Sequence, residues 1–229
     1  MGGTVLRLIR RAFLVCCGLL LIPLCLIVTW AVVSLLQSMQ PSSYSAVSVS
    51  VIALVGGFAA WVTAYFALPR PVRSYVIAHE LTHALWGYLT GANVFRMRLS
   101  RTSGSVVVSK NNVLITLAPY FFPLYTVIII LAYCIVSLFH DMGRYELAWL
   151  ALVGFSWGFH VTFTVSTLLQ HQSDVREYGR LFSYALICLL NVIGVGLWIV
   201  AVSSATLGQF WRLAVGHAAA LWRLAERLL

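Results

Sequence analysis

Five apolar runs, each long enough to cross a lipid bilayer, constrain the fold of this chain more than any other feature. They cover residues 13–36, 46–68, 113–139, 147–169 and 181–202. A transmembrane helix needs about 20 predominantly apolar residues. Charged residues make up only 9% of the chain and hydrophobic residues 61%, whereas soluble domains are about 25% charged. The sequence therefore predicts an all-α, polytopic membrane protein.

The chain shows no obvious division into domains. No Pro-, Gly- or Ser-rich linker and no low-complexity tract interrupts its 229 residues, so we expect one membrane-embedded domain over residues 1–229. The net charge of +9 comes mainly from arginines at the ends of the apolar runs. Basic residues at such positions indicate membrane orientation and contact with lipid headgroups rather than nucleic-acid binding.

One short motif carries chemistry: His79-Glu80-Leu81-Thr82-His83. On a helix, expected here from Ser74 to Thr90, the two histidines lie one turn apart on the same face, so both imidazoles can reach one metal ion. Glu80 is then free to accept a proton from a water molecule that the metal activates. This composition predicts roughly 0.003 such matches by chance, so the motif indicates a zinc site.

A catalytic zinc site of this type needs a third protein ligand and an open position for water. A second cluster of ionisable residues lies within residues 170–179. It supplies the candidates for the third ligand, in order of preference Asp174, His171 and Glu177. Asp174 is our first choice. An alternative remains, in which Asp174 belongs to a charge cluster with Arg176 or Arg180 at the membrane interface.

The apolar run before Asp174 carries a polar stripe. Its members follow helical spacing and are His160, Thr164, Thr167 and His171. A polar stripe within lipid must face protein or water. We expect it to face the metal cavity, with His160 contacting a ligand or the substrate. The alternative is hydrogen bonding between helices, which we favour for the threonines.

Two further segments differ from the apolar runs. Residues 94–99 and 105–109 alternate in polarity around a Thr-Ser-Gly turn, which predicts a β-hairpin at the membrane surface. Its edge would suit pairing with an unwound substrate, or the hairpin would serve as a membrane anchor through its arginines. Residues 205–229 are typical of an amphipathic helix that lies on a membrane face, packs on the bundle or binds a partner.

Over roughly residues 75–185 the order of these features resembles the site-2 protease family of intramembrane zinc metalloproteases. The shared features are the HExxH helix, a Gly-containing turn, the hairpin, a Pro-containing helix and an acidic residue after a further helix. The resemblance implies that His79, His83 and Asp174 bind Zn²⁺ and that Glu80 is the general base. It also implies that the substrate is a transmembrane segment of another protein.

Topology adds an expectation about location. We expect five to six transmembrane helices and a motif helix that is only half embedded in the bilayer. In this topology Asp174 and the two motif histidines lie at the same depth in the membrane. With a cytoplasmic N-terminus, most basic residues then fall inside; these are Arg7, Arg10, Arg11, Arg70, Arg73, Arg96, Arg98, Arg101, Lys110, Arg176 and Arg180. Because cytoplasmic loops carry an excess of Lys and Arg, we expect a multi-pass protein whose active site is near the cytoplasmic face.

Two functions from different classes are open. The first is a zinc metalloendopeptidase that cleaves a peptide bond in or near a transmembrane segment of a membrane-protein substrate. The second is a non-catalytic membrane scaffold, chaperone or transporter subunit with a vestigial metal site. The intact Glu80 favours the enzyme, because metal binding alone does not require it. The alternative is favoured by Ser166, which stands where the family has Asn, and by the absence of the family's prolines around Asp174.

Overall fold

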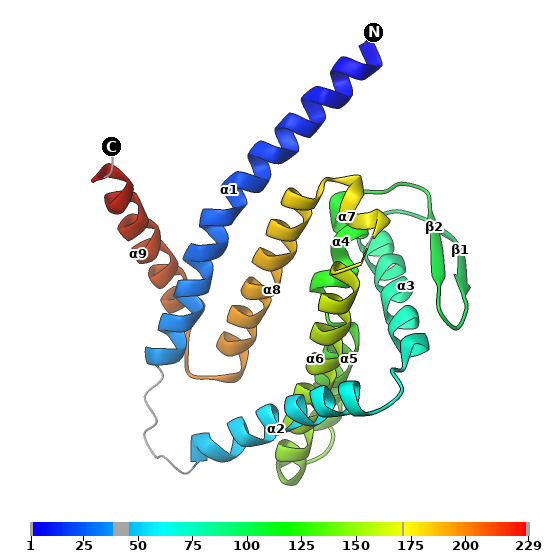
Figure 1. The fold of residues 1–229 in the computed structure, drawn as a ribbon. Helices are drawn as coiled ribbons and strands as arrows, with labels where there is room; N and C mark the ends of the chain where they lie inside the picture. The colour runs from blue at the N-terminus through cyan, green and yellow to red at the C-terminus, as the bar shows by residue number, and fades with distance from the viewer. Residues whose placement is uncertain (1, 39–45, 171, 228–229) are drawn as a thin grey trace. The chain divides into compact units, whose positions relative to one another are not determined.

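The computed structural model describes residues 2–38, 46–170 and 172–227 (Figure 1). The chain divides into two compact units. The terminal unit comprises Met1–Gln40 with Ser173–Leu229, and the central unit comprises Pro41–Gln172. Each unit has an apolar core of its own.

The described residues of the terminal unit form four helices. They are α1 (Gly2–Ser38), the short α7 (Ser173–Glu177), α8 (Arg180–Val202) and α9 (Leu207–Glu226). Figure 1 shows α8 and α9 alongside α1, and both pack against it. The core they share consists of Val28, Ala31, Val32, Leu35, Leu189, Ile199 and Phe210.

Helix α9 confirms the helix expected near the C-terminus. Thr206 and Gln209 form a capping box that satisfies amides of its first turn. Phe210 is buried in the core, and the His217 imidazole is hydrogen-bonded to the Ser34 hydroxyl at 2.9 Å. Trp222, in the C-terminal half of the helix, is 68% exposed. The helix therefore uses its N-terminal half to pack on α1.

In the central unit, α2 (Ala46–Ala67) and α6 (Glu146–Leu168) cross at very short range. The crossing depends on Gly57 and Gly154, since a Cβ on either would overlap the backbone carbonyl of Ala151 or Leu54. Small residues permit such approaches between helices. Beside the crossing lies an aromatic core of Trp61, Tyr65, Phe159 and Phe163.

Among the described residues, four helices are long and apolar enough to cross a membrane, or five if one bent pair counts as a span. The four correspond to the predicted runs in α1, α2, α6 and α8. The bent pair covers the predicted apolar run over residues 113–139, which the structure divides into two helices. Helices α4 (Val113–Phe121) and α5 (Leu124–Ser137) meet at 75° because Phe122 is extended before Pro123, which disfavours helical geometry in the preceding residue.

The motif lies on α3 (Val72–Leu89), close to the range Ser74 to Thr90 expected from the sequence. The helix begins after Pro71 and ends at Leu89; Thr90 is its C-cap, and Gly91 follows with a φ of +72° that suits glycine. The Gly91 amide donates to the Tyr88 carbonyl and the Ala92 amide to the Gly87 carbonyl. This pair of hydrogen bonds is a Schellman motif, and it turns the chain back towards the hairpin.

The predicted hairpin is confirmed as strands β1 (Val94–Leu99) and β2 (Gly104–Val108), paired antiparallel. Val94 and Val108 pack over Gly87 of α3, so one face of the hairpin covers that helix. The opposite face carries the exposed Arg96 and Arg98. A short 3-10 helix (Gly143–Tyr145) completes the central unit before α6.

Candidate metal site

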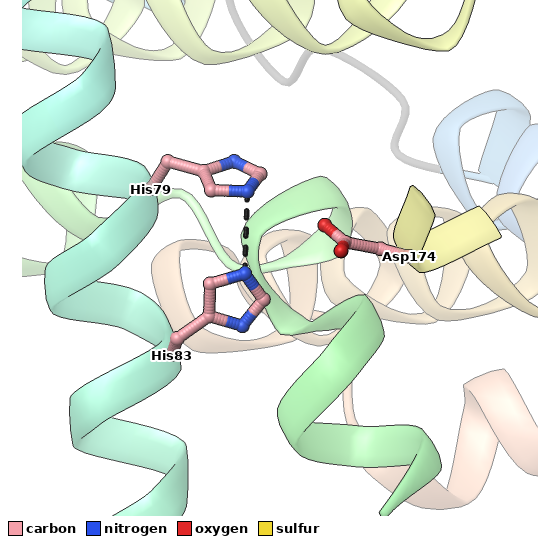
Figure 2. A group of neighbouring side chains, drawn as sticks. All are labelled: His79, His83 and Asp174. Carbon is pink, nitrogen blue, oxygen red and sulfur yellow. Dashed lines mark hydrogen bonds between the residues drawn. The ribbon is translucent and has the colours of Figure 1, made fainter. Parts of the chain in front are cut away.

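Helix α3 brings His79 and His83 together. Their Nε2 atoms are 3.2 Å apart, and the rings meet edge to face with centroids 4.8 Å apart (Figure 2). The i, i+4 spacing places both side chains on one face of the helix. Both residues are partly buried, so each keeps some exposed surface.

The outer nitrogen of each histidine is hydrogen-bonded. The His83 Nδ1 lies 2.7 Å from the Ile115 carbonyl oxygen, which can only accept. Nδ1 must therefore carry the proton, and Nε2 is left with a lone pair. The His79 Nδ1 lies 3.1 Å from the Tyr75 hydroxyl, which can donate or accept.

A hydrogen bond joins the two Nε2 atoms at 3.2 Å, and the tautomers of the rings decide which of them donates. Two histidine nitrogens bound to a tetrahedral zinc at about 2.0–2.1 Å are roughly 3.3 Å apart. The distance between the Nε2 atoms of His79 and His83 fits that spacing. This spacing would let both Nε2 atoms reach one metal ion, and each ring has a hydrogen bond at its other nitrogen.

Aromatic side chains hold this arrangement in place. The Tyr75 ring stacks on Phe163 with centroids 4.8 Å apart and an angle of 6° between the planes. The fully buried Tyr120 meets the His79 ring edge to face at 5.4 Å. These contacts restrict the rotation of Tyr75 and His79.

A cavity with about 320 Å³ of empty space, including the part open to the surroundings, adjoins His79. Its polar lining residues are Tyr75, His79, Thr82, Tyr125, Ser156 and His160. His160 of α6 therefore shares a cavity with a motif histidine. Further along the predicted polar stripe, Thr164 and Thr167 are buried within α6.

Glu80 is 7% exposed although it carries a carboxyl group. It lies against the start of β2, where a Cβ at Gly104 would be 2.7 Å from the Glu80 Oε1. The hairpin therefore covers the side chain that the motif assigns as the base.

The remaining predicted residues lie elsewhere in the chain. Asp174, drawn in Figure 2, belongs to α7 of the terminal unit, where the Ser173 hydroxyl donates to its Oδ1 at 3.2 Å. Glu177 is the last residue of α7 and is exposed. His171 lies outside the described residues. The third ligand therefore stays a prediction.

Sequence reasoning missed two groups that orient the histidines. Tyr75 precedes His79 by one helical turn, so the spacing of the sequence contained a signal for it. The Ile115 carbonyl offered none, because a backbone acceptor 32 residues from His83 has no sequence signature.

No protein-family model, curated protein or solved structure matches this chain. The resemblance to site-2 proteases rests on the motif and on the order of the elements.

Proposed function

We propose that this chain is a membrane-embedded zinc metalloendopeptidase, a divergent relative of the site-2 proteases. One observation carries the proposal: the Nε2 atoms of His79 and His83 face each other at 3.2 Å while their Nδ1 atoms are engaged by Tyr75 and Ile115. This is the donor set and orientation that a divalent zinc ion requires from two histidines.

Asp174 is the third ligand in this proposal. Its carboxylate is a donor that zinc accepts, and its partial burial suits a ligand better than a fully solvated surface charge would. It also stands where the order of elements in the family places an acidic ligand.

When bound, zinc would supply a Lewis acid that activates a water molecule and polarises a peptide carbonyl. Glu80 would accept the proton of that water and deliver it to the leaving amine. Tyr75 and the Ile115 carbonyl would hold the two imidazoles in the orientation in which both Nε2 atoms can reach the zinc. His160, which lines the cavity beside His79, would contact the substrate backbone.

The proposed substrate is a transmembrane segment of another protein. The long apolar helices of this chain are compatible with a multi-pass membrane protein, which would meet such a segment within the bilayer. A helical substrate must unwind before its peptide bonds become accessible, and an edge of the β1–β2 hairpin would pair with the unwound strand.

The test uses the full-length protein in detergent and in lipid nanodiscs. The model substrate is a fluorescent fusion protein with one Leu/Ala-rich transmembrane segment that contains Gly and Pro. We expect about one zinc per chain by elemental analysis and cleavage of this substrate by the parent protein. Glu80→Gln should keep the zinc and lose at least about 100-fold in turnover. Zinc binding without cleavage in the parent would favour the non-catalytic scaffold instead.

A further inference from the structure

Gly104, the first residue of β2, lies directly against the side chain of Glu80. A Cβ built on Gly104 would overlap the Glu80 Cγ and would lie 2.7 Å from Oε1 and 2.8 Å from Cδ. Real Cβ atoms essentially never approach other atoms within 3.0 Å. The side chain of Glu80 therefore occupies the volume that any other residue at position 104 would fill.

The backbone at Gly104 does not itself require glycine. The glycines with positive φ, among the residues that the structure describes, are Gly91 and Gly179. The turn before Gly104 is held without it, because the Ser100 amide donates to the Ser103 carbonyl and the Ser100 hydroxyl also bonds to Ser103. Space beside Glu80, not turn geometry, accounts for a glycine at this position.

The strand register explains why the contact falls on the glutamate. Residues 104, 106 and 108 share one face of β2, since side chains alternate along a strand. Val108 lies against Gly87 near the end of α3, and Gly104 lies against Glu80 two turns earlier. Strand β2 thus runs along α3, and each of the two close contacts has a glycine. At one contact the glycine is Gly87 of the helix, and at the other it is Gly104 of the strand.

We propose that Gly104 is a positioning residue for the general base. The Glu80 side chain packs against the backbone of Gly104 at the start of β2, and this contact restricts the direction of the carboxylate. The inference rests on the proposed function, in which Glu80 accepts the proton. A catalytic group must be held to within about 0.5 Å of its productive position, so a shift caused by one methyl group would impair turnover.

The first measurement is a thermal double-mutant cycle on the full-length protein. Gly104→Ala should lower Tm by roughly 5 °C, because its Cβ would overlap the buried Glu80 side chain and overpacking is destabilising. The same substitution should have no such effect in a Glu80→Ala background, where the obstructing atoms are gone. Gly56→Ala is the matched control, because a Cβ at Gly56 would meet nothing within 4 Å.

The second measurement follows zinc content and cleavage of the model substrate. Gly104→Ala should keep one zinc per chain, since the histidines are untouched, and should lose at least ten-fold in kcat with KM unchanged. Unchanged Tm and kcat in Gly104→Ala, or an equal Tm loss in both backgrounds, would overturn the inference. A parent protein without zinc or cleavage would instead overturn the proposed function, and the thermal cycle would still decide whether residue 104 holds Glu80.

Discussion

The Tyr75 hydroxyl lies 3.1 Å from the Nδ1 of His79, one helical turn further along α3. Partners of this kind fix the orientation of a metal-binding imidazole, and their loss typically weakens metal affinity by about 10–100-fold. Tyr75→Phe should therefore weaken zinc binding by that factor, measured by competition with a chromophoric chelator. Tyr88→Phe, on the same helix and 77% exposed, is the control that should bind zinc as the parent does. Equal affinities in both variants would remove Tyr75 from the site.

The facing imidazoles of His79 and His83 predict the effect of removing either one. His79→Ala and His83→Ala should each abolish stoichiometric zinc, because one of only three proposed protein ligands is lost. Elemental analysis of the purified protein checks this expectation. His140→Ala, in an exposed connection, should retain the metal. Full zinc occupancy in either motif variant would show that zinc binds elsewhere.

The third ligand can be separated from its neighbours. Asp174→Ala should lose zinc and turnover together, by at least about 100-fold in affinity, because a ligand has been removed. His171→Ala and Glu177→Ala should both keep zinc. If His171→Ala loses zinc while Asp174→Ala binds it normally, the assignment of the third ligand is wrong and the two motif histidines keep their role.

The crossing of α2 and α6 predicts a structural effect far from the motif. Gly57→Ala should destabilise the central unit by about 1–3 kcal/mol, because its Cβ would overlap the Ala151 carbonyl and force the helices apart. Thermal unfolding in detergent measures the loss. Gly56→Ala, the adjacent glycine with open space around its Cα, should leave Tm unchanged or slightly raised. Equal Tm values for both variants would contradict the close crossing.

The sequence by itself determined the features that repeat along the chain or depend on neighbouring residues. Apolar runs predicted the long helices, and i, i+4 spacing predicted that His79 and His83 share a face. Alternating polarity predicted the hairpin. These features follow from backbone periodicity and local steric preference, which a short window of sequence contains.

Only the tertiary structure decided which groups surround the motif. The Ile115 carbonyl orients His83, Gly104 lies against Glu80, and His160 lines the cavity beside His79. The bend at Phe122 also divides the apolar run over residues 113–139 into two helices. Such contacts join residues far apart in the chain through backbone atoms or the absence of a side chain. The residue types alone therefore did not reveal them, because packing rather than local periodicity selects which distant groups meet.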